Sequence, residues 1–391
     1  MEWKECQIQD VCRLINGRAY SNDEMLEHGK YKIVRVGNLS GGNSTWFYSD
    51  LELPEDKYCH NGDLLFAWAC TFGPHIWKED NTIFHYHIWK IVEDKDVVDR
   101  RFFYYYLKYA TGGFLGALNG SVMVHITKSS MEKMNIRIPK NLEDQRRIAS
   151  ILSSLDRKIE LNNKINADLE EMAQAIFKNW FVDFEPFKDG KFVDSELGMI
   201  PEGWKVGTLK DLLYLRKDSI KAANKGNLPY LPIDTIPMHC LVATDFKSND
   251  EAKSSLQTFE QNDIVVGAMR VYFHRVILAP CKGITRTTCF VLSVKNENAL
   301  AYSLMQCNQD EAISFAEKTS KGSTMPYAVW DGGYGEYKVV IPPSEVMKSF
   351  NDLLSNFFSK MNKNAIENSR LSLLRDTLLP RLMSGELEVP E

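Results

Sequence analysis

The chain has 391 residues, of which 44% are hydrophobic and 25% are charged, and this composition excludes a largely disordered protein. The length predicts two or three domains at about 150 residues each. The chain has 47 basic and 52 acidic side chains, which give a net charge of −5. This charge excludes a general electrostatic attraction to nucleic acid, so any such binding must come from local basic patches.

No apolar run approaches the roughly 20 residues of a membrane span, and the first ten residues are acidic and polar, unlike a secretory signal. We therefore expect a cytoplasmic protein without membrane contact. The eight cysteines contain no Cys-x-x-Cys pair, and we expect them to be reduced thiols.

Residues 1–140 and 201–341 have the pattern of mixed α/β domains. β-branched and aromatic side chains predict strands over 31–36, 64–68 and 83–91 in the first segment and over 264–268 and 288–294 in the second. Helices are expected over 100–110 and 299–306. The order of the strands does not follow from these patterns. The predicted fold class is α+β.

The two segments are related by an internal repeat with a shift of about 200 residues. Four pairs of short sequences support it: Trp3-Lys4 with Trp204-Lys205, Gly62-Asp63-Leu64-Leu65 with Asn262-Asp263-Ile264-Val265, Gly120-Ser121-Val122-Met123 with Gly322-Ser323-Thr324-Met325, and Ile138-Pro139 with Ile341-Pro342. A repeat of this length predicts two similar lobes related by a pseudo-twofold axis.

A long amphipathic helix with a heptad seam is expected after each Ile-Pro pair. The seam positions are Ile148, Leu152, Leu155, Ile159, Asn162, Asn166, Leu169, Ala173 and Ile176 in the first copy and Phe350, Leu354, Phe357, Met361, Asn364, Asn368, Leu371, Arg375 and Leu378 in the second. A seam asparagine costs stability but fixes register. We predict an intramolecular antiparallel coiled coil, with Asn162 near Asn368 and Asn166 near Asn364, that acts as a ruler of roughly 50 Å. The alternative is two separate helices, each lying on its own domain.

Known catalytic motifs are absent from the sequence. It contains no Gly-x-x-x-x-Gly-Lys phosphate loop and no Asn/Asp-Pro-Pro-Tyr/Phe methyltransferase signature. Triplets at 55–57 and 93–95 resemble part of a nuclease site, but such triplets arise readily in a chain this rich in charge. His75, His85 and His87 are candidate metal ligands without carboxylate or thiol partners at useful spacing. We expect no catalytic residue and no metal site.

Each lobe carries a loop that mixes aromatic, basic and histidine side chains, WACTFGPHIWK at 68–78 and MRVYFHR at 269–275. Arg and Lys read guanine edges and also bind phosphates. The predicted DNA contacts are Trp68, His75, Lys78, Arg270, Tyr272, His274, Arg275 and Arg286. The alternative is that the aromatic side chains are core and the basic ones form a solvated rim. Since the two loops differ while the repeat anchors match, we expect each lobe to read a different sequence.

Three connector sequences resemble the type I restriction-modification specificity subunits. They are LEDQRRIA at 142–149 running into ILSSLD at 151–156, FKNWFVDFEPF at 177–187, and GMIPEGW at 198–204. The resemblance covers essentially the whole chain. It departs at 344–348, where SEVMK stands in place of the usual Glu-x-Gln.

The resemblance implies two target recognition domains at 1–140 and 183–341, the latter with its linker. The conserved helices at 141–182 and 342–391 would form the coiled-coil spacer, the second with the tail. It implies a non-catalytic subunit that reads a bipartite, asymmetric site in double-stranded DNA. Two methyltransferase subunits would supply S-adenosylmethionine-dependent adenine methylation, and restriction subunits using ATP and Mg²⁺ would join them, while this chain itself binds no cofactor. The competing hypothesis is a stand-alone sequence-specific DNA-binding regulator.

Overall fold

The computed structural model describes residues 1–39, 45–69, 72–117, 126–243 and 246–389, without the side chains of 113–117. The chain forms two compact units. Unit 1 comprises Met1–Arg157 with Leu373–Glu391, and unit 2 comprises Lys158–Ser372. Each unit contains part of both long helices, α4 (Leu142–Phe181) and α8 (Ser344–Ser384).

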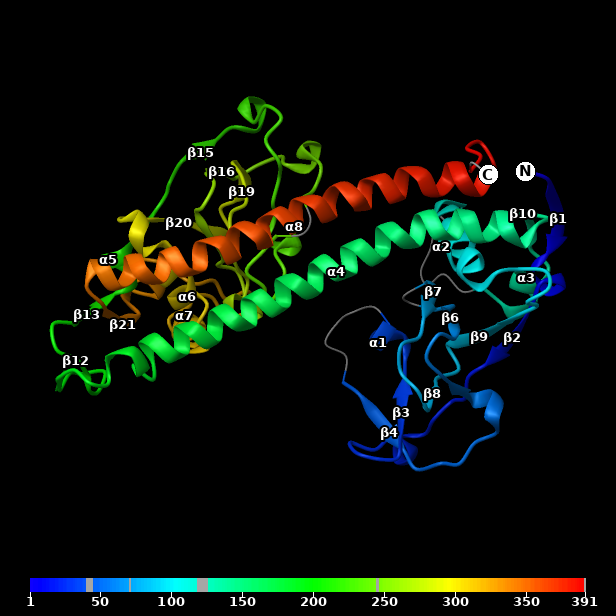
Figure 1. Cartoon of the computed structure of the whole chain (residues 1–391), viewed down its shortest axis with the longest axis horizontal. Helices are drawn as coiled ribbons and strands as arrows, with labels where there is room; N and C mark the ends of the chain where they lie inside the picture. Colours follow the sequence, from blue (N-terminus) through cyan, green and yellow to red (C-terminus); the bar gives the residue numbers. More distant parts are fainter. Residues whose placement is uncertain (40–44, 70–71, 118–125, 244–245, 390–391) are drawn as a thin grey trace. The chain divides into compact units, whose positions relative to one another are not determined.

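Unit 1 contains two four-stranded sheets and one two-stranded sheet (Figure 1). The first sheet has the order β2 (Cys12–Asn16), β9 (Ile88–Glu93), β6 (Leu64–Ala67) and β7 (Gly73–Ile76). The second has the order β4 (Phe47–Ser49), β3 (Tyr31–Val34), β8 (Thr82–Phe84) and β5 (Tyr58–Cys59). The third pairs β1 (Trp3–Gln7) with β10 (Asn135–Pro139). The helices are α1 (Val36–Leu39), α2 (Arg100–Ala117) and α3 (Lys128–Glu132).

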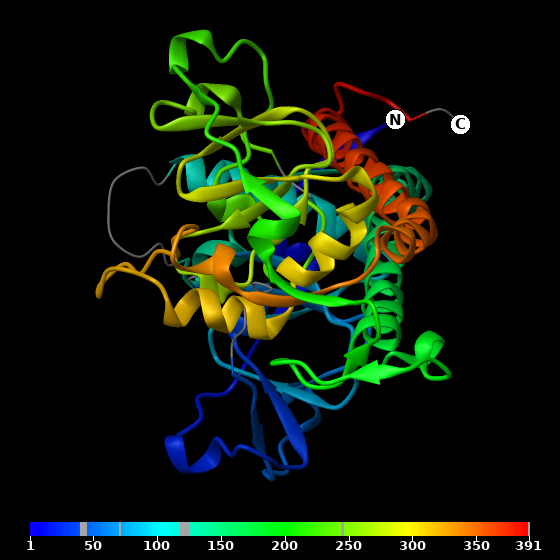
Figure 2. The same ribbon diagram turned by 90° about the vertical axis from the view of Figure 1, so that its left-hand side faces the viewer.

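Unit 2, coloured green to orange in Figure 2, has in its described residues a four-stranded sheet, a three-stranded sheet and two strand pairs. Its four-stranded sheet has the order β14 (Leu213–Leu215), β20 (Cys289–Val294), β17 (Ile264–Gly267) and β18 (Val276–Leu278). Its three-stranded sheet has the order β15 (Ser219–Ile220), β16 (Leu256–Phe259) and β19 (Gly283–Arg286). Two pairs complete it, β13 (Lys205–Thr208) with β21 (Lys338–Ile341) and β11 (Phe192–Val193) with β12 (Ile200–Pro201). The helices are α5 (Leu209–Leu212), α6 (Leu300–Cys307) and α7 (Asp310–Lys318).

The predicted internal repeat is confirmed by the strand order, since β2-β9-β6-β7 corresponds to β14-β20-β17-β18 and β1-β10 to β13-β21. The registers match as well: Lys4 lies opposite Ile138, and Lys205 lies opposite Ile341. The third anchor of the repeat, residues 120–123, lies outside the described residues.

A conserved turn detail also repeats between the units. Gly62 and Asn262 have φ angles of +90° and +69°, a left-handed conformation that glycine and asparagine tolerate best. The next residue, Asp63 or Asp263, accepts a hydrogen bond from the backbone N–H three positions earlier, at 2.9 and 2.7 Å respectively. The same side-chain chemistry therefore fixes the entrance to β6 and to β17.

The core of each unit includes one segment of each long helix. In unit 1, Leu382 and Met383 of α8 join Leu152 of α4 in one buried cluster with the sheet and α2. In unit 2, Phe177 of α4 and Phe350 of α8 pack with Tyr302 of α6 in another. Because burial of one such side chain contributes about 1.5–3 kcal/mol, both helices are integral parts of the two units.

One predicted strand was wrong. Residues 83–91 do not form a single strand, because β8 ends at Phe84 and β9 begins at Ile88. His85–His87 make the turn between them, and the N–H of Ile88 donates to the carbonyl of His85 at 2.9 Å. His85 and His87 therefore do not lie within a strand, as the predicted strand over 83–91 would have required.

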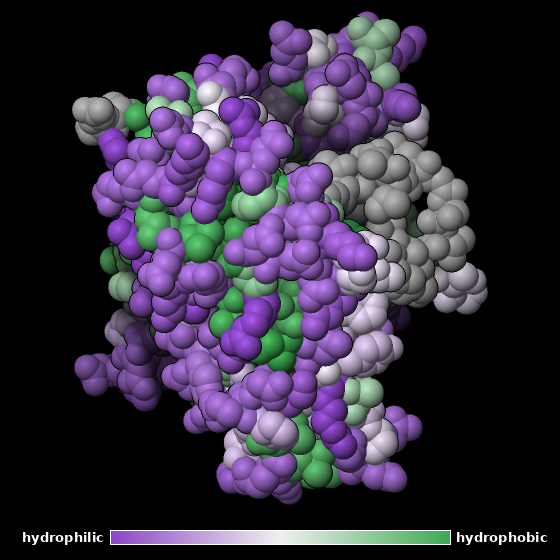
Figure 3. All heavy atoms as spheres, turned by 90° about the vertical axis from the view of Figure 1, so that its right-hand side faces the viewer, coloured by the Kyte–Doolittle hydropathy of each residue, from purple (hydrophilic) through white to green (hydrophobic). Residues whose placement is uncertain are grey.

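No helix within the described part of the chain is long and apolar enough to cross a membrane. On the face drawn in Figure 3, hydrophilic residues cover most of the surface, with apolar residues in small patches between them.

Candidate nucleic-acid interface and helix pairing

The long helices pair through the seam asparagines. Asn162 Nδ2 donates to Asn368 Oδ1 at 2.9 Å, and Asn364 Nδ2 donates to Asn166 Oδ1 at 2.8 Å. All four side chains are buried, with exposed fractions between 0% and 5%. As the residue number rises on α4 it falls on α8, so the helices run antiparallel, side by side as Figures 1 and 2 show. These are the two pairs that the sequence register predicts.

Further hydrogen bonds extend this polar layer. Asn162 Nδ2 also lies 2.8 Å from Glu367 Oε2, and Asn368 Nδ2 donates to Asn163 Oδ1 at 2.8 Å. Asn166 Nδ2 donates to the carbonyl of Met361 at 3.2 Å. The hydrogen bond from Asn162 lowers the pKa of Glu367. Of the four seam asparagines, only Asn162 has a buried polar atom, Oδ1, without a partner. A shifted register would leave more such atoms unpaired.

Arg375, a polar residue at a seam position, pairs with carboxylates inside unit 1. Arg375 Nη1 donates to Asp156 Oδ1 at 2.8 Å, and the hydroxyl of Tyr105 donates to Asp156 Oδ2 at 2.6 Å. Burial, followed by the neighbouring Asp156 carboxylate, raises the pKa of Tyr105. This group ties α2 to α4 and α8.

Three of the predicted DNA contacts lie at the surface of unit 2. Arg270 and Arg286 are exposed, and the Tyr272 side chain is 43% exposed. Arg270 has a φ of +50°, and its N–H donates to the carbonyl of Pro326 at 2.8 Å. Arg270 and Arg286 lie on neighbouring segments, because the N–H groups of Ala268 and Met269 both donate to the carbonyl of Thr288.

A hollow of about 460 Å³ lies beside these segments, and sequence reasoning missed it. Its lining includes Met269, Thr287, Lys321, Met325, Tyr327 and Trp330. The Met325 and Tyr327 side chains are about half exposed, at 51% and 48%. The repeat anchor at 322–325 marked this segment as part of the scaffold, but no sequence signal placed it next to Arg270.

Two other predicted DNA contacts, His274 and Arg275, have hydrogen-bond partners inside unit 2. His274 is 5% exposed, and its Nε2 lies 3.0 Å from Asn308 Oδ1. The Arg275 guanidinium donates to the backbone carbonyls of Ile233 and Ile236, the latter at 2.9 Å. Arg275 thus stabilises the loop that contains Ile233 and Ile236, because it donates hydrogen bonds to backbone carbonyls that lie outside the strands.

In unit 1, the predicted DNA contacts of the 68–78 loop differ in burial. Trp68 is half-buried, its Nε1 donates to the carbonyl of Tyr86 at 2.9 Å, and its ring stacks on Trp89. His75 lies on β7, where burial and then the Lys108 charge lower its pKa. Lys78 is exposed. Residues 70 and 71 of this loop lie outside the described part of the chain.

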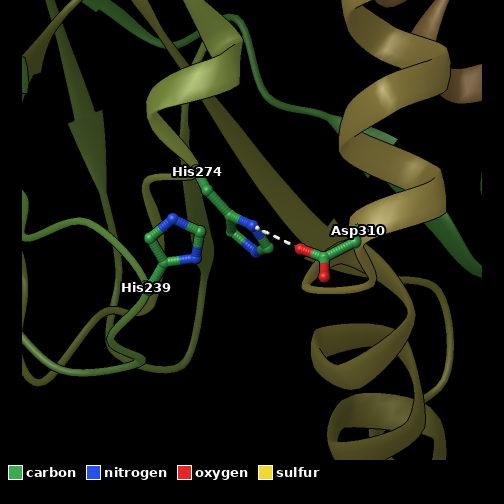
Figure 4. A group of neighbouring side chains, drawn as sticks. All are labelled: His239, His274 and Asp310. Carbon is green, nitrogen blue, oxygen red and sulfur yellow. Dashed lines mark ion pairs between the residues drawn. The ribbon is translucent and has the colours of Figure 1, made fainter. Parts of the chain in front are cut away.

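His75, His85 and His87 do not form a group of three ligands. Among the residues that the structure describes, one such group exists, His239, His274 and Asp310 (Figure 4). No sequence pattern pointed to this group, because its members are far apart along the chain.

Comparisons with known proteins agree with the connector sequences. The family model described as the type I restriction modification DNA specificity domain matches residues 1–171. The MjaIX specificity subunit of Methanocaldococcus jannaschii is 30% identical over 313 residues, which cover 76% of this chain and 71% of that protein. The chain belongs to the type I restriction enzyme specificity subunits. Another relative of this specificity subunit, the HindI specificity subunit of Haemophilus influenzae, is 23% identical over 99% of this chain and 100% of its own.

The fold of the specificity subunit also has a solved counterpart. The S subunit of the type I restriction-modification system from M. genitalium superposes with a TM-score of 0.60 at 17% identity, covering 98% of this chain and 96% of that one. The mixed α+β fold with long helices is therefore shared. Both relatives are named as specificity subunits of type I restriction enzymes.

Proposed function

We propose that unit 1 and unit 2 each recognise one half of a split, asymmetric site in double-stranded DNA. The internal repeat carries this proposal. The order β2-β9-β6-β7 corresponds to β14-β20-β17-β18, the β1-β10 pair to β13-β21, and the aspartate turns recur, whereas residues 68–78 and 269–275 differ. A constant scaffold with different loops suits two readers of different sequences.

The contacts to DNA would come from exposed basic and aromatic side chains on these loops. In unit 2 these are Arg270, Tyr272 and Arg286, and in unit 1 Lys78 and the edge of Trp68, with His75 nearby on β7. Arg reads guanine through two hydrogen bonds, and an exposed tyrosine offers both a ring face and a hydroxyl. Since the net charge is −5, these local groups must supply the attraction to phosphate.

The pairing of α4 with α8 would set the spacing between the half-sites. A helix of 40 residues such as α4 is about 60 Å long at 1.5 Å per residue. Such a rod would hold the two half-sites at a fixed separation of about one to two DNA turns of ~34 Å each. The asparagine layer fixes the register of the two helices and, with it, this spacing.

Methyltransferase subunits would dock on the helices. Apolar side chains remain exposed on them, including Leu161 at 52%, Met172 at 50% and Leu373 at 70%. In this proposal two methyltransferase subunits hold S-adenosylmethionine and flip the target adenine out of the duplex. Restriction subunits would bring ATP and Mg²⁺, and the specificity subunit would contribute no catalytic group.

Co-expression with a type I methyltransferase subunit from the same source, in a host without adenine methylation, tests this function. We expect genome mapping to find a bipartite methylated motif that requires both genes. A soluble complex without methylation above background would contradict the proposal, and salt-dependent, sequence-specific binding by the isolated chain would favour the regulator hypothesis.

A further inference from the structure

His239, His274 and Asp310 come together from three separate segments of unit 2 (Figure 4). His239 lies on a loop, His274 follows the short 3₁₀ helix Val271–Phe273, and Asp310 is the first residue of α7. Their nitrogen and oxygen ligand atoms all lie within 4.8 Å of one another. They line an open hollow of about 700 Å³, so solvent reaches the group.

The hydrogen bonds of His274 define which ring nitrogen carries a proton. Nε2 lies 3.1 Å from the backbone carbonyl oxygen of Asn308, which can only accept a hydrogen bond. Nε2 therefore carries the hydrogen. In the neutral ring Nδ1 is then an acceptor, yet it faces Asp310 Oδ1 at 3.1 Å. Two acceptors at this distance repel each other unless a positive charge lies between them.

A metal-ligating histidine has this same arrangement. Its free ring N–H is usually donated to a backbone carbonyl or carboxylate, which orients the ring and fixes the tautomer. A tetrahedral zinc ion, with bonds near 2.0–2.2 Å, holds neighbouring ligand atoms about 3.3 Å apart. The 3.1 Å between His274 Nδ1 and Asp310 Oδ1 is close to that value.

His239 lies where it can be the third ligand beside His274 and Asp310. Its ring centroid lies 4.5 Å from that of His274, and the backbone N–H of His239 donates to the backbone carbonyl of His274 at 2.8 Å. Both histidines have a φ of +50°, an uncommon backbone conformation for a residue other than glycine. Since the His239 side chain is exposed, its ring can rotate by the small amount that closes the coordination.

We propose that His239, His274 and Asp310 bind a divalent cation of the zinc class, with a fourth position open to water. Imidazole and carboxylate ligands are a common donor set for zinc. The nearby lysines do not compete, because Lys178 pairs with Asp183 and Lys338 pairs with Glu196. The ion would occupy the place between Nδ1 and Oδ1 where a positive charge is required.

The ion would also anchor a recognition loop to α7. His274 ends the segment that carries Arg270 and Tyr272, so a bond from its ring to an ion held by Asp310 restricts that segment. This consequence rests on the proposed DNA contacts, whereas the metal site itself does not depend on them.

The test uses the full-length chain, stripped of metal by a chelator and titrated with Zn²⁺ against a chromophoric competitor, in the absence of DNA. We expect one ion per chain. His239→Ala and Asp310→Asn change exposed side chains and should weaken Zn²⁺ binding by at least about tenfold. The matched controls Glu311→Gln and His28→Ala, also at exposed positions, should bind like the unchanged chain.

Co²⁺ substitution gives a second readout, since its visible absorption reports nitrogen and oxygen ligation in a tetrahedral site. Absence of stoichiometric Zn²⁺ binding would overturn the proposal. Equal affinity in His239→Ala, Asp310→Asn and the unchanged chain would overturn it as well, because the ion would then bind elsewhere. Thermal melting of each variant verifies that it is folded.

Discussion

Asn162 and Asn368 share a hydrogen bond of 2.9 Å inside the seam between α4 and α8, where both side chains are almost completely buried. A pair of leucines would pack there with less desolvation cost, but it would accept several registers. The hydrogen bond between the two amides forms only when the helices align as they do here. Because each helix contributes to the core of both units, this alignment is linked to the folding of the whole chain.

Replacing one member of this pair should cost more than replacing both. Asn368→Leu leaves a buried amide of Asn162 without one partner, and we expect a loss of about 1–3 kcal/mol in the free energy of unfolding. Asn162→Leu combined with Asn368→Leu should recover part of this loss, since neither seam amide then remains. Urea denaturation measures both changes. Asn179→Leu, at an exposed position of α4, serves as the control; a simple sum of the two single effects would contradict the pairing.

The Asp156 carboxylate should stabilise unit 1 through its two partners. Asp156→Ala removes the acceptor for Arg375 Nη1 and for the Tyr105 hydroxyl, and we expect a loss of about 1–3 kcal/mol. Asp376→Ala removes the other, more exposed carboxylate beside Arg375 and should cost less than about 1 kcal/mol. Similar losses in the two variants, measured by chemical denaturation, would show that Asp156 has no special role.

Glu170 should make unit 2 less stable as the pH rises. Burial raises the pKa of this carboxyl, although the Leu241 N–H donates to it at 3.1 Å. Because the folded state holds the proton more tightly than the unfolded state, this stabilisation is complete below the unfolded pKa and is lost as the pH rises through the folded pKa. Glu170→Gln should therefore become more stable relative to the unchanged chain above pH 4.5.

Thermal melting across a pH series measures that difference. Glu171→Gln changes the exposed neighbouring carboxylate and should leave the profile unchanged. If the stability difference between Glu170→Gln and the unchanged chain does not vary with pH, the raised pKa of Glu170 is refuted.

Substitutions in the two loops should affect separate half-sites. Arg270→Ala should weaken recognition of one half of the target by about 1–3 kcal/mol if the guanidinium reads a base, and Lys78→Ala should affect only the other half. Binding of the assembled complex to duplexes altered in one half at a time measures this. Lys282→Ala, which removes an exposed lysine paired with Glu260, is the control. An equal loss at both halves from either variant would contradict two independent readers.

Patterns along the sequence predicted the long-range features that recur at fixed spacing. The heptad seam and the matching asparagines gave the helix pairs, because a side chain at every third or fourth position faces the same neighbour. The repeat anchors marked turn residues such as Asp63 and Asp263, whose hydrogen bonds are local. The order of the strands did not follow, because pairing between strands depends on residues that are distant along the chain.

The site residues were harder to predict, because burial is not visible in a loop sequence. His274 and Arg275 stand beside exposed Arg270 and Tyr272 in the same seven-residue loop, yet they bond inward to Asn308 and to Ile236. The group formed with His239 and Asp310 has no sequence signature, since the fold alone brings these segments together.

Two independent readers can be tested by exchanging residues 1–140 for the corresponding segment of another specificity subunit and then mapping adenine methylation in the presence of the methyltransferase. We expect one half of the methylated motif to change while the other half and the spacing stay the same. A change in both halves, or a change in the spacing alone, would contradict a chain built from two independent readers on a fixed helical spacer.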